Sequence, residues 1–289
     1  MRVDLHMHTS ASDGQFSPRE IVEMARKIGL NVIAVTDHDT TDGVIEAQTT
    51  AQTGMPITVL AGIELSAEEP NEQKGFRDVH MLGYLLRVDD AVLQGKLEKF
   101  RRDRAERGQK IVTKLGELGM PIAWDRVVAL AGGGAGENQR VSIGRPHIAR
   151  AMIEAGYVDS IPDAFNRFLN PDRPAYVARE RLSPEGAIAL IHQAGGVAVL
   201  AHPAKLRDYA AMVERLVPAG LDGVEVVHPA NPEGVRLDLR ALAIRYGLIM
   251  TGGSDFHGMD SQGNISLGAY NPPQNALTAL RERATRYAP

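Results

Sequence analysis

The 289-residue chain contains no cysteine. Disulfide bonds, thiolate zinc sites and catalysis by a cysteine nucleophile are therefore excluded. The chain also lacks an apolar run of about 18 residues that could span a bilayer. Its first residues, MRVDLHMHTS, lack the apolar middle of a signal peptide. We expect a cytoplasmic protein without a membrane partner.

Aromatic residues are scarce, and neither sign of charge dominates. Phe, Trp and Tyr make up 5% of the chain, and 32 basic residues face 36 acidic ones. Few aromatics disfavour broad surfaces for stacking bases, and the near balance of charge disfavours a general polyanion-binding surface. A general nucleic-acid binder is thus disfavoured. If the substrate is a nucleotide, the positive charge that binds its phosphates must come from a local group of residues or from metal ions.

Short apolar segments alternate with amphipathic helical stretches along the chain. Several are solidly apolar, which is typical of parallel strands covered on both faces. Helix starts are marked by Ser17 and Ser183, each followed by proline, and Glu20 completes a capping box. Asn31 and Gly54 stand where helices should stop. Seven such units predict an α/β barrel. The predicted strands are 3–7, 32–36, 58–63, 79–85, 197–201, 223–227 and 248–251.

One long stretch contains no convincing strand. Residues 89–118 read as a charged helix, followed by a glycine-rich turn at 132–134 and by helices beginning at Arg145 and Ile161. We expect a helical insertion that caps the active site. The predicted division is 1–94 and 181–289 for the barrel and 95–180 for the insertion domain.

Seven of the nine histidines fall at or just beyond the predicted C-terminal end of a strand, where βα barrels carry their chemistry. Four carboxylates share this position. A mixture of unrelated core and surface residues does not explain the shared location. Neutral imidazoles and carboxylates are ligands of Zn²⁺, Mn²⁺ and Fe²⁺. The residues are His6, His8, His38, His80, His202, His228 and His257, with Asp13, Asp37, Glu64 and Asp255.

Each motif alone has an ordinary explanation. His6 and His8 are two apart on a strand and point to one face, Asp13 lies in a turn motif, and Asp39 suits a helix cap. Their combination predicts a centre of two to three divalent ions, Mn²⁺ first, with Zn²⁺ and Fe²⁺ as alternatives. His192 lies inside a predicted helix and is expected to be structural.

In this order, the motifs DLHMHT, SDG, TDHD, GIE, VH, AHP and GSDFHG resemble the PHP (polymerase and histidinol phosphatase) family. The resemblance covers about 1–90 and 180–260, and it implies a distorted, TIM-like (βα)7 barrel with a trinuclear metal centre. Asp13 stands where some relatives have histidine. The implied ligand sets are His6, His8, Glu64 and Asp255 for one ion; Glu64, His80 and His202 for a second, with Glu64 bridging; and Asp13, His38 and His257 for a third.

The run IGRPHIA at 143–149, followed by Ala164-Phe165 and PAYV at 174–177, resembles one subgroup of this family. Its members are nucleoside 3′,5′-bisphosphate phosphatases, and some trim short RNA from the 5′ end. The resemblance implies a metal-dependent phosphoesterase that removes the 3′-phosphate and leaves a nucleoside 5′-monophosphate. Hydrolysis by a metal-bound hydroxide, rather than by a side-chain nucleophile, suits the ligand set.

Substrate binding needs cations outside the metal centre. Arg145 offers a bidentate fork for a phosphate, and His147 lies at a helix start that can bind an anion. His228 is either a support for a ligand or a proton donor to the leaving oxygen. Weaker candidates for binding the substrate are Lys110, Arg140 and Lys205.

Other functions stay open. The same metal site suits a histidinol-phosphate phosphatase, another small-molecule phosphatase or an amidohydrolase. A different class is a non-catalytic, metal-bearing structural domain, which is disfavoured because every expected ligand position is filled. The sequence leaves the metal identity, the oligomeric state and the physiological substrate undetermined.

Overall fold

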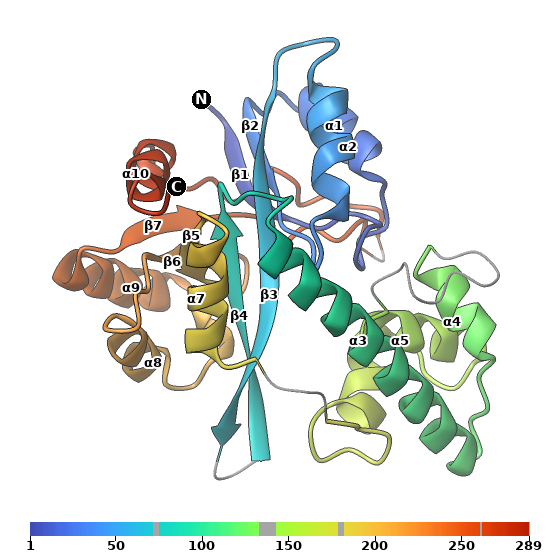
Figure 1. Ribbon diagram of the computed structural model, residues 1–289. Coiled ribbons are helices and arrows are strands. Elements are labelled where there is room, and N and C mark those ends of the chain that lie inside the picture. The colour runs from blue at the N-terminus through green and yellow to red at the C-terminus, as the bar shows by residue number, and fades with distance from the viewer. Residues whose placement is uncertain (72–74, 133–142, 179–181, 261, 289) are drawn as a thin grey trace.

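Seven strands form one sheet that curls into a nearly closed barrel (Figure 1). The computed structural model describes residues 1–71, 75–132, 143–178, 182–260 and 262–288. Strand order follows the chain, and the segment after the last strand returns to the first, where His8 N donates to Phe256 O at 2.9 Å. The strands are β1 Val3–Met7, β2 Val32–Val35, β3 Thr58–Asn71, β4 Gly75–Tyr84, β5 Val197–Leu200, β6 Gly223–Val227 and β7 Ile249–Gly252.

Strand β4 departs from the expected parallel arrangement. It runs antiparallel to both β3 and β5, whereas the other neighbouring strands are parallel. The chain returns from β3 directly into β4 without a helix, and an antiparallel pair needs only a tight connection. Both strands are longer than predicted, so the hairpin projects beyond the other strands at the lower edge of Figure 1.

Helices cover the outside of the barrel, and their starts follow the predicted signals. Ser17 Oγ accepts from Glu20 N, and the Glu20 carboxylate accepts from Ser17 N at 2.8 Å, which completes the predicted capping box. The predicted helix ends are less accurate. The first helix was expected to end at Asn31, but it ends at Lys27, and the chain turns at Gly29, which has a φ of +77°. The covering helices are α1 Pro18–Lys27, α2 Asp42–Ala51, α7 Pro184–Gln193, α8 Tyr209–Leu216, α9 Glu233–Tyr246 and α10 Ala276–Ala284.

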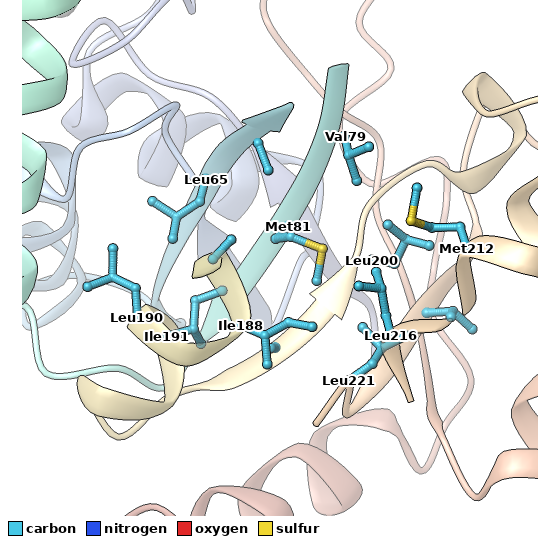
Figure 2. Close-up of a cluster of buried hydrophobic side chains, with 14 of the residues drawn as sticks. Leu65, Val79, Met81, Ile188, Leu190, Ile191, Leu200, Met212, Leu216 and Leu221 are labelled. Atoms are coloured by element: carbon cyan, nitrogen blue, oxygen red, sulfur yellow. The ribbon is translucent and has the colours of Figure 1, made fainter. Parts of the chain in front are cut away.

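The largest apolar core lies between the sheet and these helices. Figure 2 shows Met81 and Leu200 of neighbouring strands packed near Ile188 of α7, with Leu216 of α8 beside them. A second cluster fills the barrel itself and includes Leu277 of α10. Because the barrel interior is packed with side chains, chemistry is confined to its mouth.

The segment between β4 and β5 is helical and has its own core. Its elements are α3 Ala91–Glu117, α4 Trp124–Leu130, α5 Arg145–Glu154, α6 Ile161–Ala164 and the π-helix η1 Phe165–Leu169. Helix α4 was not predicted, and Gly133 and Gly134 lie outside the described residues. Leu93 and Leu97 of α3 pack in the core between the sheet and its covering helices, whereas Ile111 and Leu115 pack in the core of the insertion. The predicted boundary at residue 95 therefore falls inside one continuous helix. No helix in the described ranges is long and apolar enough to cross a membrane.

A buried carboxylate fastens the C-terminal segment to the barrel. Asp222 Oδ1 accepts from Arg283 Nη1 at 2.8 Å and from Tyr287 OH at 2.9 Å, while Oδ2 lies 2.8 Å from His192 Nε2. Burial alone would raise the pKa of Asp222, but hydrogen bonds from His192, Ala198 and Arg283 lower it below its ordinary value. His192 thus has the structural role expected for it.

Asp222→Ala should lower the free energy of unfolding by about 3 kcal/mol at pH 7, because it removes the buried carboxylate and leaves the half-buried Arg283 guanidinium without its ionic partner. The folded pKa of Asp222 is below the unfolded value near 4, so the carboxylate stabilises the fold above that value and stops doing so as the pH falls through the folded pKa. Denaturant titrations of both proteins at pH 7 and pH 3 measure this, with the exposed Asp125→Ala as control. The same loss at both pH values would contradict the electrostatic explanation.

Candidate metal centre

The nine predicted ligands all lie at one mouth of the barrel. Most follow strand ends as expected, but Glu64 and His80 do not, because they lie in the middle of the long strands β3 and β4. Since β4 is antiparallel to its neighbours, its residues before Met81, the partner of Leu200 at the end of β5, lie at the mouth to which the other strands point their C-terminal ends. His80 thus lies at the predicted mouth, but the strand-end reasoning that predicted it there does not apply to an antiparallel strand.

Glu64 of β3 is at the centre of the group and is fully buried, with 0% of its surface exposed. Its Oε1 lies 2.9 Å from both His80 Nδ1 and His202 Nε2. One carboxylate oxygen thus faces two imidazole nitrogens. This is the set that the family resemblance implies for a second ion.

The other oxygen of Glu64 faces a second set. Oε2 lies 3.3 Å from His6 Nε2 and 3.2 Å from His8 Nε2. Asp255 Oδ1 lies 3.3 and 3.2 Å from the same two nitrogens. Both ring nitrogens of His8 are buried and form no hydrogen bond with the described residues. Two anionic oxygens that both face the Nε2 atoms of two buried imidazoles fit a divalent cation.

The third set is looser. Asp13 Oδ1 lies 3.3 Å from His257 Nε2 and 3.7 Å from His8 Nδ1, and Asp13 Oδ2 lies 4.0 Å from His38 Nε2. The side chain of His257 is half-buried, whereas those of His6 and His8 are fully buried. We infer that an ion held by this set is bound more weakly than one held beside Glu64.

The carboxylates of the three sets are ionised. Burial raises the pKa of Glu64, Asp13 and Asp255, but the surrounding histidines outweigh burial and hold all three pKa values well below the ordinary range. Lys205 also lowers the pKa of Asp255, since its Nζ lies 3.2 Å from Asp255 Oδ2. The mouth thus carries a concentrated negative charge that a cation would neutralise.

The imidazoles divide into two groups. Burial lowers the pKa of His38 to about 3 and that of His202 to about 4, so both are neutral at pH 7, as ligands must be. Burial also lowers the pKa of His8, but the carboxylates of Asp255 and Glu64, each 3.2 Å from its Nε2, raise it to about 10. A cation that binds there displaces a proton from His8.

Glu225 of β6 is a supporting residue that the sequence analysis missed. Its Oε1 lies 2.9 Å from His6 Nδ1, and its Oε2 accepts from His202 N at 2.7 Å. It fixes the orientation of His6 and the position of the loop that carries His202. A lone glutamate inside the apolar run GVEVV was the available signal, since an isolated charge in a buried strand needs a partner.

His228 lies behind Asp255 rather than in front of it. The side chain is buried, its Nδ1 accepts from Ala230 N at 2.9 Å, and its Nε2 lies 3.3 Å from Asp255 Oδ2. It lines neither of the clefts described below. Of the two roles considered for His228, this placement favours support of Asp255 over proton donation to a substrate.

Strained backbone is concentrated at the mouth. Asp39, His202 and Asp255 have φ values of +52°, +30° and +52°, in the left-handed region that non-glycine residues rarely adopt. Such strain persists only where surrounding structure enforces it. Close packing adds a further constraint, because a Cβ on Gly253 would lie 2.4 Å from His6 N. Backbone strain and close packing thus constrain the loops after these strands.

Two clefts flank His80. The inner cleft, of about 160 Å³, separates the metal centre from the insertion, and the basic cleft, of about 560 Å³, opens on the other side. Asp78, His80 and Arg145 line both. The inner cleft is otherwise lined by Asp13, His38, Ser66, Arg104, Arg107, Gly108, Ile111, Ile143, Gly144, Pro146, Ile148 and Phe165. The basic cleft is otherwise lined by Arg77, Asn166, Asn170, Pro171, Arg173, Ala201, His202, Lys205, Leu206 and Arg207.

Arg145, the first residue of α5, lies where the two clefts meet. Its Nη2 donates to Asp78 Oδ2 at 2.8 Å and its Nη1 to Leu169 O at 3.2 Å. The guanidinium carbon lies 5.3 Å from the centre of the Phe165 ring. These contacts hold the guanidinium beside the metal centre.

The other predicted substrate-binding residues have varied surroundings. His147 points inward, with 1% exposure, and its Nδ1 accepts from Gly144 N at 3.0 Å, so it caps its own helix and is poorly placed to meet a substrate. Burial lowers its pKa to about 4. Lys110 is exposed and lines neither cleft, whereas Lys205 lines the basic cleft. Arg140 lies outside the described residues.

Arg104 of α3 is a second residue that the sequence analysis missed. It is largely buried, donates through Nε to Asp39 Oδ2 at 2.9 Å and through Nη2 to Ser66 Oγ at 2.9 Å, and lines the inner cleft. Its pair with Asp39 joins the insertion to the barrel mouth. The sequence offered no signal for it, because α3 is rich in arginine and most of its charges look like a solvated face.

Comparisons with known proteins bear on this site. The PHP domain model matches residues 4–155. The chain is 32% identical to the 5′-3′ exoribonuclease Rnm of Escherichia coli, over 88% of this chain and 84% of the relative. It is also 32% identical to the 3′,5′-nucleoside bisphosphate phosphatase of Chromobacterium violaceum, over 88% and 87%. A solved structure from Bifidobacterium adolescentis, described as a candidate metal-dependent phosphoesterase, matches with a TM-score of 0.85 and 33% identity over 97% and 96%.

Glu64→Gln should lower the number of divalent ions bound per chain, because the carboxylate faces two proposed ligand sets. Elemental analysis after reconstitution with Mn²⁺ measures the change independently of activity. Glu68→Gln, a buried glutamate on the same strand outside the ligand sets, is the matched control. Normal metal content in a folded Glu64→Gln protein would remove Glu64 from the bridging role.

Proposed function

The chain belongs to the PHP domain family of metal-dependent phosphoesterases, and on that basis we propose that it hydrolyses the 3′-phosphate of nucleoside 3′,5′-bisphosphates. The products are the nucleoside 5′-monophosphate and phosphate. The observation that carries this proposal is the position of Arg145, which borders both clefts and is close to the metal centre. A bisphosphate needs such a second anion site beside the reacting one.

We assign the metal-ligand role to the nine residues predicted from the sequence. Bound divalent ions, Mn²⁺ first and Zn²⁺ or Fe²⁺ as alternatives, supply Lewis acidity and make a water molecule nucleophilic at neutral pH. The ligands are His6, His8, Asp13, His38, Glu64, His80, His202, Asp255 and His257. Glu225 and His228 hold His6 and Asp255 in place, as partners behind metal ligands commonly do.

Arg145 anchors the phosphate that is not cut. To do so, its guanidinium exchanges the Asp78 carboxylate for a phosphate oxygen, and charge-assisted bonds to a phosphate dianion favour the exchange. Leu169 O and the Phe165 ring keep the guanidinium in position during the exchange. Lys205, beside Asp255, is a further cation within reach of the reacting phosphate.

The insertion, which we treat as a domain over 95–180, caps the site. It contributes Arg104 and apolar residues such as Ile111 and Ile148 to the inner cleft, and this mixture suits a nucleoside better than a small polar alcohol. A histidinol-phosphate phosphatase has no evident need for this wall. The names of the curated relatives, which refer to nucleotides and RNA, support the same choice.

Trimming of short, 5′-phosphorylated RNA is the second candidate function. It is favoured by the exoribonuclease relatives. The same anchor serves both reactions, since Arg145 would hold the 5′-phosphate of a terminal nucleotide whose 3′-phosphate is being cut. The two activities differ only in what is attached beyond the reacting phosphate.

Removal of divalent ions should abolish phosphate release, and returning Mn²⁺ should restore it, because the proposed nucleophile is a water molecule activated by those ions. Phosphate release from adenosine 3′,5′-bisphosphate, before and after chelation, is the measurement. Full turnover by protein shown to be free of metal would contradict the proposed chemistry.

Arg145→Ala should lower kcat/KM for adenosine 3′,5′-bisphosphate. The loss of transition-state stabilisation calculated from the ratio of the two kcat/KM values should be about 1.5–3 kcal/mol, the range for a hydrogen bond to a charged group. Turnover of an aryl phosphate, which has no second phosphate, should change little. Arg167→Ala, an exposed arginine of the same domain that lines neither cleft, is the control. Equal losses on both substrates would remove Arg145 from the anchor role. Release of the 5′-phosphate would show that the substrate binds in the opposite direction.

A further inference from the structure

The basic cleft contains more positive charge than a mononucleotide needs. Three parts of the chain form it: β4, the insertion near η1, and the loop that follows β5. Five lysine and arginine side chains line it beside a single carboxylate, Asp78. In a chain with a net charge of −4, this is a local concentration of positive charge. The five residues are Arg77, Arg145, Arg173, Lys205 and Arg207.

Three of the five cations already have carboxylate partners. Arg145 pairs with Asp78 at 2.8 Å, and Lys205 pairs with Asp255 at 3.2 Å. Arg77 contacts both Glu69 and Asp208. The charge of these three residues is therefore largely compensated within the protein.

Arg173 and Arg207 are different. Both are exposed, and neither guanidinium forms an ion pair or hydrogen bond with the rest of the described chain. Asn166 and Asn170 place amide groups along the same cleft. Unpaired guanidinia in a cleft that begins at His80 and His202 are suited to an anionic ligand continuous with the reacting phosphate.

We propose that Arg173 and Arg207 bind the phosphodiester chain of a single-stranded oligonucleotide, on the 3′ side of the phosphate that is cut. This inference rests on the proposed function for the position of that phosphate. The terminal nucleoside occupies the inner cleft, Arg145 holds its 5′-phosphate, and the rest of the chain follows the basic cleft. At about 560 Å³, that cleft is more than three times the size of the inner one.

Two substrates that react at the same metal centre should differ in whether they contact Arg173 and Arg207. A nucleoside bisphosphate ends at the reacting phosphate and does not reach Arg173 or Arg207. An oligonucleotide continues past it, so each guanidinium can neutralise a phosphate and release its counterions. Removing the two charges should therefore affect only the longer substrate.

The test is the double variant Arg173→Ala/Arg207→Ala, compared with Arg281→Ala/Arg286→Ala, which removes the same charge on and just after α10 across the barrel from the insertion (Figure 1). We expect kcat/KM for adenosine 3′,5′-bisphosphate to stay within twofold. For a 5′-phosphorylated RNA hexamer it should fall at least tenfold. The control should change neither value. Equal losses on both substrates, or an unchanged hexamer rate, would overturn the proposal.

Salt dependence provides a second readout. Fluorescence anisotropy can follow the binding of a fluorescent, phosphorothioate-linked 5′-phosphorylated RNA hexamer at several salt concentrations. The magnitude of the slope of log K against log salt should fall by about 0.7 for each phosphate contact that the variant removes. An unchanged slope would overturn the proposal. If wild-type protein hydrolyses no bisphosphate, the proposed function fails, but hexamer binding still tests the two arginines.

Discussion

The buried negative charge of Glu64 is the constraint on which the barrel mouth depends. An ionised carboxylate without solvent exposure is costly unless compensating groups surround it. Here the imidazoles of five histidines approach its two oxygens, and they come from four strands or the loops that follow them. Each of these elements must be in place before the charge is compensated. The strained residues His202 and Asp255 show how tightly the loops are held.

The barrel and the insertion divide the work between them. The barrel supplies fixed charge, which any phosphate ester could use, and it supplies it on rigid strand ends. The insertion supplies one wall of each cleft, and we propose that this wall selects which molecule presents its phosphate. Arg104 links the two parts, since it leaves α3 and binds Asp39 at the mouth. Substrate choice in such an architecture can change through the insertion while the metal centre stays constant.

Much of the fold and of the site could be predicted because the signals are local. Motifs such as DLHMHT place two imidazoles on one strand face, and the apolar runs mark most strands within a few residues, although β3 continues to Asn71, eight residues beyond its predicted end. The direction of β4 could not be predicted, because an apolar run reads the same in a parallel or an antiparallel strand. The pairs Glu225–His6 and Arg104–Asp39 join residues far apart in sequence, and no local pattern specifies them. The inward turn of His147 likewise depends on tertiary packing.

The position of the insertion also has a consequence for how the chain folds. Strands β4 and β5 are hydrogen-bonded neighbours, yet Tyr84 and its partner Val197 are more than 100 residues apart. During synthesis, β4 must wait with one edge unpaired until the whole insertion has emerged. The insertion has its own apolar core, and its described members all lie between Ala105 and Val177. If that core forms first, it shortens the flexible loop that must close before β5 can pair. A weakened insertion core would then prolong the exposure of the β4 edge, which is a surface prone to aggregation.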